Sequence, residues 1–373
     1  MCCAPWESVL LLLRITSAVF TTFTRYVTRN CTPKFPNWSL RFELLHAVIR
    51  ECTEAYGERM VVVKHARVIR SQSDALGSVL GWFSCRQLGR RLEPVHFNGL
   101  EHVWLRPMQS RGRGARRLVV LYLHGGGFAV LSPRLYISLG AALAFSIEKK
   151  QKQHHTINDR IEILLGNYRK APEYQFPAQP MDAMALYENY LLESEGLEPS
   201  QIILAGDSAG GGLVMSVLLR LRDTKPELFP LAGMLISPAV DLSGDEPEAP
   251  HCFLSPNLCA AVCTAYHANR NDPSEWADAS SVHRDLRDLP PVFLQAGRLD
   301  YIYQQSDRLA AKAAVDGATN WEVDIHDDMP HVFSIFPVFV LPYAQVGVQK
   351  LAAFAAKQFL KSGYSDSILA RSR

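Results

Sequence analysis

The strongest constraint on the fold of this chain is a short glycine-rich run, Gly206-Asp207-Ser208-Ala209-Gly210. It follows the apolar residues 202–205 and leads into residues 211–222, whose apolar positions recur at helical spacing. A serine in such a strand–turn–helix setting projects from the turn as a nucleophile. Glycine suits the positions on either side because a Cβ there would collide with neighbouring backbone. The run therefore predicts a strand, a tight turn carrying Ser208, and a helix.

A second glycine-rich run, His124-Gly125-Gly126-Gly127-Phe128, follows the apolar residues 118–123. Consecutive glycines after a strand can bring backbone N–H groups close to a substrate oxygen. A nucleotide-binding loop is disfavoured, because the run lacks the lysine and spacing of a P-loop and no dinucleotide-binding glycine pattern appears. With Ser208 downstream, the run predicts an oxyanion hole made by the backbone N–H groups of Gly125, Gly126 and Ala209.

Hydrophobic patterning places these runs in an alternation of strands and helices. Strands are predicted at 101–106, 118–124, 161–168, 202–205, 231–237, 291–296 and 321–325. Helices are predicted at 135–149, 180–192, 211–222, 306–316 and 343–361. Alternating strands and helices indicate a mostly parallel central sheet flanked by helices on both faces.

The first part of the chain differs from this pattern. Residues 39–56 and 74–92 show helical spacing, while 60–68 is rich in β-branched residues, and regular alternation starts only near Val95. We therefore predict an N-terminal segment and helical cap over residues 1–94 and a catalytic domain over residues 95–373. Residues 244–290 also leave the alternation and are predicted to form a lid insertion.

A serine is nucleophilic near neutral pH only beside a base that a third group orients. Asp300 follows the strand predicted at 291–296, and His331 follows the last predicted strand, 321–325. The order serine, acid, histidine is that of α/β hydrolases. His326 lies nearer the end of the last strand and is the main rival to His331. The sequence therefore predicts Ser208, His331 and Asp300 as nucleophile, base and orienting acid.

The chain resembles the hormone-sensitive lipase family of α/β hydrolases, which includes carboxylesterases and arylacetamide deacetylase. The resemblance covers roughly residues 95–362 and rests on four blocks: His124–Phe128, Tyr168–Pro177 with Asp182, Gly206–Gly211, and the pair Asp300 and His331. It implies an α/β-hydrolase fold with an N-terminal helical cap, the same catalytic and oxyanion-hole residues, no metal and no organic cofactor.

Two features depart from or elaborate the family pattern. Lys170 stands where the family commonly has leucine, and Gln304 stands where members often carry a second acid. Within the second block, Arg169 and Glu173 are expected to pair and hold the loop in place.

The expected activity is hydrolysis of short- to medium-chain or aromatic acyl esters through an acyl-enzyme on Ser208. An amidase or deacetylase of arylacetamide or formylkynurenine type is an alternative within the same machinery. A non-catalytic ligand-binding module on this fold is a second alternative, because fold alone does not prove activity. The expected partner is a small-molecule ester, and the patterns leave the oligomeric state open.

Composition narrows the remaining classes. The formal net charge of +2 gives no electrostatic footprint for nucleic acid. Eight cysteines in 373 residues do not form a disulfide scaffold. Cys259, Cys263 and His267 share a helical face, but no fourth ligand is evident, so a metal site is not predicted.

The N-terminal apolar segment, residues 8–27, is interrupted by Arg14 and Arg25 and has no basic residue before it. This pattern favours a cap or interfacial helix over a spanning one or a signal peptide. We therefore predict a cytoplasmic protein with peripheral membrane contact through residues 8–27. An anchor in the endoplasmic reticulum is the alternative, for which the sequons at Asn30 and Asn37 would matter.

Overall fold

The chain is built on an eight-stranded sheet, seen in a computed structural model that describes residues 5–109, 115–153, 159–244 and 246–371. The strand order is β1-β2-β4-β3-β5-β6-β7-β8. The strands are β1 (Arg90–Phe97), β2 (Leu100–Pro107), β3 (Arg117–Leu123), β4 (Arg160–Gly166), β5 (Ile202–Asp207), β6 (Ala232–Ile236), β7 (Val292–Gly297) and β8 (Trp321–His326). From β4 to β8 neighbouring strands pair in parallel, whereas β1 and β2 add an antiparallel edge.

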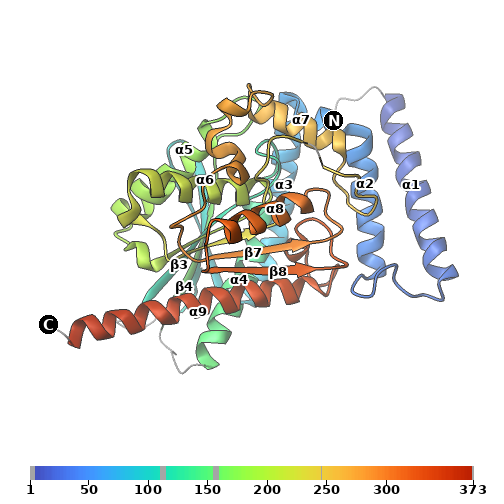
Figure 1. Cartoon of the computed structure of the whole chain (residues 1–373). Coiled ribbons are helices and arrows are strands. Elements are labelled where there is room, and N and C mark those ends of the chain that lie inside the picture. Colours follow the sequence, from blue (N-terminus) through green and yellow to red (C-terminus); the bar gives the residue numbers. More distant parts are fainter. Residues whose placement is uncertain (1–4, 110–114, 154–158, 245, 372–373) are drawn as a thin grey trace.

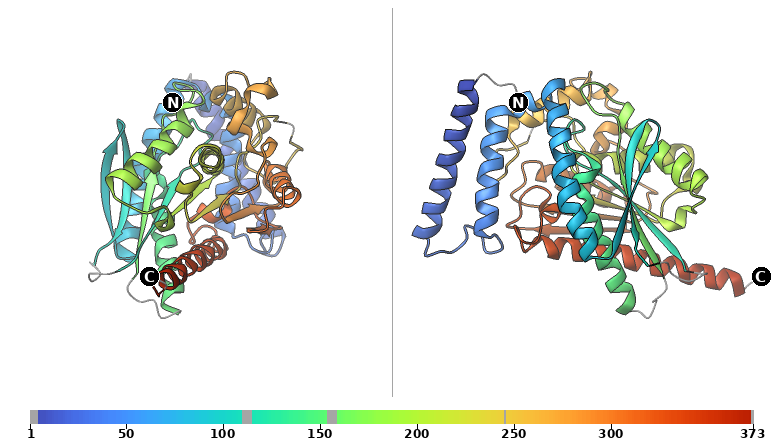
Figure 2. Two further views of the ribbon diagram at one scale, coloured as in Figure 1. Left: turned by 60° about the vertical axis from the view of Figure 1, so that its left-hand side comes forward. Right: turned by 180° about the vertical axis from the view of Figure 1, so that it is seen from behind.

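Helices cover both faces of this sheet (Figures 1 and 2). The helices are α1 (Pro5–Thr28), α2 (Leu40–Met60), α3 (Val63–Gln87), α4 (Ile137–Gln153), α5 (Ala178–Ala185), α6 (Ala209–Thr224), α7 (Pro256–Tyr266), α8 (Tyr303–Val315) and α9 (Ala344–Arg371). Buried residues of α5, α6 and α8 form one hydrophobic core with the sheet. Buried residues of α4 and α9 form the core on the other face.

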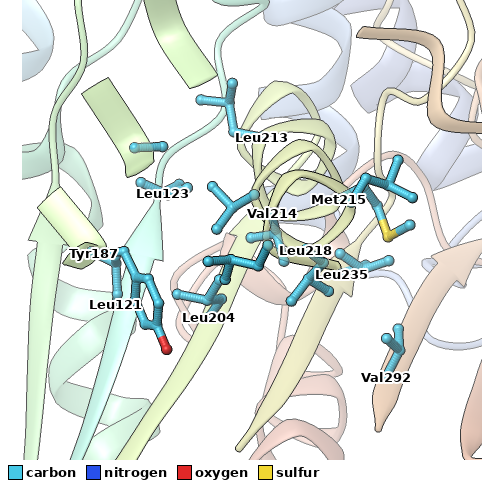
Figure 3. Packing of buried hydrophobic residues seen from close by; sticks show 14 of the residues in the cluster. Leu121, Leu123, Tyr187, Leu204, Leu213, Val214, Met215, Leu218, Leu235 and Val292 are labelled. Atoms are coloured by element: carbon cyan, nitrogen blue, oxygen red, sulfur yellow. The ribbon is translucent and has the colours of Figure 1, made fainter. Parts of the chain in front are cut away.

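The centre of the first core lies where α6 crosses the middle strands (Figure 3). Val214 and Leu218 of α6 belong to the same buried cluster as Leu204 of β5 and Leu235 of β6, and all four are fully buried. Burying a side chain of this size stabilises a fold by about 1.5–3 kcal/mol. This packing makes the β5–α6 junction, where Ser208 lies, a rigid part of the molecule.

The sheet confirms the predicted α/β architecture, and all seven predicted strands are present. The structure differs at one edge. Residues 90–92, which were expected to continue a helix, begin β1 instead, because α3 ends at Gln87. The β-branched stretch at residues 60–68 is the junction of α2 and α3 together with the first turns of α3.

The N-terminal helices and α7 form a layer at one end of the sheet (Figure 1). α1 packs on α2, and α2 packs on both α3 and α7. α7 belongs to the segment 244–290, for which a lid was predicted. The division into residues 1–94 and 95–373 stays a prediction, and β1 lies across its boundary.

Within the described residues, one helical stretch, Val9–Thr28 of α1, is long and apolar enough to cross a membrane, and none of it is buried.

Candidate active site

Ser208 occupies a strained turn between β5 and α6. Its backbone has φ of 49° and ψ of −119°, a conformation that residues with a side chain rarely adopt. A Cβ on Gly210 would lie 1.9 Å from the carbonyl oxygen of Leu123, and one on Gly206 would lie 2.4 Å from the carbonyl oxygen of Gly210. The two glycines are therefore required for the close approach that presents Ser208 beyond the end of β5.

Asp300 and His331 come from the loops that follow β7 and β8. Both are buried, at 3% exposure each, and His331 Nδ1 lies 2.8 Å from Asp300 Oδ2. Asp300 Oδ1 also accepts a hydrogen bond from the Ile302 N–H at 3.0 Å. Because Asp300 is held from two sides, it can fix the orientation of the His331 ring.

Ser208 and His331 line the same cavity, which has a volume of about 360 Å³. Among the described residues, no hydrogen bond joins the two side chains, although such bonds are often long before substrate binds. His326, the rival histidine, lies elsewhere. Its ring contacts Asp324 Oδ2 at 2.9 Å and the Tyr343 hydroxyl at 3.1 Å. The geometry thus favours His331 as the base.

The glycine loop lies against the residue before the nucleophile. The Gly125 N–H donates to Asp207 Oδ1 at 3.0 Å and to the Tyr136 hydroxyl at 3.2 Å. This N–H is therefore already used, and the expectation that it serves the oxyanion hole needs correction. Gly126 and Gly127, by contrast, line the cavity with Ser208. Ala209, fully buried, is the first residue of α6, where N–H groups have no partner within the helix.

The carboxylate of Asp207 binds several groups around the glycine loop. Its carboxylate also accepts hydrogen bonds from the hydroxyls of Tyr122 and Tyr136, each at 3.0 Å. Complete burial raises the pKa of Asp207 to about 6 despite these donors. A Cβ on Gly125 would lie 2.3 Å from Asp207 Oδ2, so only glycine permits this contact. Sequence reasoning did not assign a role to Asp207, although its place beside Ser208 was visible.

The surroundings of His124 indicate a structural role for this residue. Burial, together with the nearby Lys170 charge, holds its pKa well below its usual value, so the ring is neutral. Its Nδ1 lies 2.6 Å from the carbonyl oxygen of Gly125, and its ring stacks on Tyr168. This environment fits a residue that orients the loop rather than one that carries protons.

The charged pairs around the site differ from the expected ones. Arg169 pairs with Asp182, with N–O distances from 2.8 Å, and not with Glu173. Glu173 instead pairs with Arg70 of α3 at 2.9 Å and with Arg67 at 3.0 Å. The expected Arg169–Glu173 pair was wrong because the partner of Glu173 comes from the cap, about 100 residues away in sequence.

Apolar side chains make up most of the cavity wall. They come from the α2–α3 junction, from α3, from α7 and from the loop after β8: Met60, Val61, Ile69, Leu258, Val262, Ile335 and Phe336. α1 contributes none of the lining residues. A cavity of this size and lining suits the apolar part of a small ligand.

The two cysteines of α7, Cys259 and Cys263, belong to the wall of the cavity. Burial raises the pKa of both thiols. His267 stacks on Phe176. Across the described part of the chain, no three His, Cys, Asp or Glu side chains lie close enough to hold an ion.

Comparison with known proteins places this geometry among hydrolases. A family model described as alpha/beta hydrolase fold matches residues 120–335. The chain is 32% identical to an acetyl-hydrolase of Streptomyces hygroscopicus, over 67% of this chain and 78% of that protein. It is 33% identical to human arylacetamide deacetylase-like 2, over 53% of this chain and 51% of that protein. The crystal structure of an esterase from the bacterial hormone-sensitive lipase family superposes with a TM-score of 0.67 at 26% identity, covering 88% of this chain and all of that one.

Proposed function

The chain belongs to the hormone-sensitive lipase family of α/β hydrolases and is a carboxylic-ester hydrolase, and from this premise we propose that it cleaves short- to medium-chain or aromatic acyl esters through an acyl-enzyme on Ser208. The observation that carries the proposal is the shared cavity of Ser208 and His331, with Asp300 bound behind the histidine at 2.8 Å. These are the parts that acyl transfer to a serine requires.

In the proposed reaction, His331 removes the proton from the Ser208 hydroxyl as its oxygen attacks the ester carbonyl carbon. The tetrahedral intermediate then expels the alcohol, which takes the proton from His331, and leaves an acyl group on Ser208. Water attacks this acyl group with His331 again as base, and the acid and free Ser208 are released. Asp300 holds the ring of His331 and stabilises its protonated form.

The oxyanion is proposed to accept hydrogen bonds from the backbone N–H groups of Gly126, Gly127 and Ala209. Gly127 takes the place first expected for Gly125, whose N–H donates to Asp207. Losing one such donor typically lowers kcat by about 10²–10³. Asp207 and Tyr136 would hold the loop so that the next two N–H groups face the cavity.

The size and lining of the cavity support the substrate class. A volume of about 360 Å³ lies near the lower end of ligand sites, which favours small acyl groups over long lipid chains. An amide substrate is the second candidate, favoured by the similarity to human arylacetamide deacetylase-like 2.

A panel of nitrophenyl esters and matching anilides of graded chain length tests the proposal. We expect turnover of short esters, a fall with chain length, and complete loss in Ser208→Ala. A fluorophosphonate probe should label Ser208 alone. Ester turnover that survives in Ser208→Ala would exclude the proposed nucleophile, and faster anilide turnover would favour the deacetylase alternative.

We also propose that residues 8–27 make a peripheral membrane contact and that the catalytic domain is cytoplasmic. The exposed apolar character of α1 supports the membrane contact. Alkaline carbonate without detergent should release the full-length chain from membranes. Resistance to this wash with a glycan on Asn30 would favour the alternative, an anchor with a lumenal domain. Asn37 is a poorer reporter because its side-chain amide donates to Asp328.

A further inference from the structure

α1 turns its apolar side outward. Trp6, Leu12, Leu13 and Phe20 are all more than 60% exposed, although they lie on a well-formed helix at the edge of the molecule (Figures 1 and 2). A helix on the surface of a soluble protein normally buries such residues, and large exposed apolar patches mark contact with a partner or a membrane. We therefore expect the outer face of α1 to contact an apolar surface.

Polar residues of the same helix are exposed as well, but they lie along a second cavity beside the contact between α1 and α2. Arg14, Ser17, Thr21 and Arg25 recur every three or four residues, so they share one face. They line a cavity of about 710 Å³ whose opposite wall comes from α2 and the loop between the two helices. This cavity is separate from that of Ser208, with which it shares no lining residue.

Positive charge exceeds negative charge on the wall of this second cavity. Its cations are Arg14, Arg25, Arg29, Lys34 and Arg50, and its carboxylates are Glu43 and Glu51. The two carboxylates are already paired, since Glu51 binds Arg14 at 2.9 Å and Glu43 binds Arg29 at 2.6 Å. Arg50 reaches Glu54 at 2.6 Å.

Arg25 and Lys34 are the two cations of this cavity that the ion pairs above do not include. Neither forms an ion pair in the described structure, and the ammonium of Lys34 lies 2.9 Å from a ring nitrogen of His251. Partial burial and the charges of Arg50, Arg29 and Arg25 lower the pKa of Lys34. The hydroxyls of Ser17, Thr21 and Thr22 add hydrogen-bond donors to the same wall.

We propose that this cavity binds the phosphate headgroup of an anionic phospholipid, with Arg25 and Lys34 as its cationic ligands. The apolar face of α1 would lie in the acyl region of one leaflet, as in other interfacial helices, and the polar face would then lie at the depth of the phosphates. Arginine and lysine side chains are the usual partners of phosphate. A membrane surface with anionic headgroups thus matches both faces of the helix, the acyl region the apolar face and the phosphates the polar one.

Vesicle binding by the full-length chain tests this. Vesicles of phosphatidylcholine alone are compared with vesicles that also contain phosphatidylserine. We expect the unmodified chain to prefer the anionic vesicles, and Arg25→Gln/Lys34→Gln to lower that affinity by roughly tenfold or more. The matched control, Lys149→Gln/Lys152→Gln, removes two exposed positive charges at the far end of α4 and should keep the preference.

An equal loss in both double variants would show general electrostatic attraction and overturn the site. No preference for anionic vesicles in the unmodified chain would overturn it as well. Should Arg25→Gln/Lys34→Gln unfold at a lower temperature, Thr21→Val/Thr22→Val removes donors without changing charge and should weaken binding. Inorganic phosphate tests whether the ligand is a lipid headgroup or free phosphate. If inorganic phosphate, at the same concentration as the lipid phosphate, completely blocks vesicle binding, the site binds free phosphate and the lipid assignment is overturned.

Discussion

At the scale of single residues, Asp207 links the two glycine-rich runs. Its carboxylate holds the N–H of Gly125, while its neighbour Ser208 starts the turn into α6. The first N–H of the glycine loop is thereby used for anchoring, and the residues that follow, Gly126 and Gly127, line the cavity. One buried carboxylate therefore sets the relative position of Ser208 and its proposed oxyanion donors.

The assignment of the base can be tested by replacing each histidine in turn. We expect His331→Ala to lower kcat for nitrophenyl butyrate by several orders of magnitude, about 10³–10⁶, because the serine then has no proton acceptor. His326→Ala should be mild, since that ring contacts Asp324 and Tyr343 outside the cavity. A severe effect of His326→Ala with a mild effect of His331→Ala would reverse the assignment.

Lys170 predicts a pH-dependent stability. Burial, reinforced by the charge of Arg70, lowers its pKa to about 7. Between that value and its unfolded pKa of 10.5, the unfolded chain holds more protons, so the free energy of unfolding rises with pH. Below pH 7 the charged group remains in a poorly solvated site and costs stability.

Lys170→Leu, the residue common in the family, removes this titration. We expect the variant to melt at a higher temperature than the unmodified chain at pH 7 and below, and the gap to shrink toward pH 10. Thermal unfolding of both proteins across this range measures the gap. A gap that does not change with pH would mean that Lys170 keeps its ordinary pKa.

At the scale of elements, α3 couples the cap to the catalytic loops. Arg70 donates to the carbonyl oxygen of Ala129 at 2.7 Å and to that of Ala171 at 2.8 Å. Its guanidinium also makes two parallel contacts with Glu173, each at 2.9 Å. Ala129 follows the glycine loop directly, so a cap helix holds the segment that carries the proposed oxyanion donors.

Arg70 is therefore predicted to be a positioning residue. Arg70→Lys keeps the positive charge but loses the planar guanidinium that binds several acceptors at once. The loop should then be displaced, which lowers kcat for a soluble ester by about 10- to 100-fold with little change in KM. Arg67→Lys is the control, because exposed Arg67 contacts Glu173 but neither carbonyl. Equal effects of the two variants, or a change confined to KM, would contradict the positioning role.

At the scale of the whole molecule, the active-site cavity is assembled from parts far apart in sequence. Ser208 and His331 come from the ends of parallel strands, while α2, α3 and α7 add the apolar walls. α1 is different, since it packs on α2 and lines only the second cavity. The chain thus combines a catalytic body with one peripheral helix.

A chain that begins at Thr32 is expected to fold and to hydrolyse soluble short esters at a nearly unchanged rate. The ion pairs of Arg14 with Glu51 and of Glu7 with Arg59 are partly exposed and contribute about 0–1 kcal/mol each. The pair of Arg29 with the buried Glu43 is lost as well, and Glu43 becomes open to solvent once residues 1–31 are absent. Vesicle binding should be lost with the exposed apolar face. Thermal unfolding, ester turnover and vesicle binding measure the three properties. A large drop in melting temperature would show that α1 supports the catalytic body.

Several features could be predicted from the sequence because short segments determine them. The glycines around Ser208 form a recognisable local pattern, and the apolar runs of β3 to β7 reflect strands buried on both faces. The proximity of Asp300 and His331 was predictable for a related reason, since the ends of parallel strands meet at one edge of the sheet. The helical cap followed from helical spacing, but β1 did not, because it is an edge strand with charged residues and Pro94.

Only the tertiary structure decided which groups meet. The use of the Gly125 N–H by Asp207, the pairing of Glu173 with Arg70, and the cavity between α1 and α2 all join residues that no local pattern relates. By itself, the sequence determined the α/β architecture, the turn that carries Ser208 and the order of the candidate catalytic residues, because these follow from local backbone geometry and burial. Partners across the chain depend on how whole elements pack, so hydrogen bonds and charge pairs between them appear only in three dimensions.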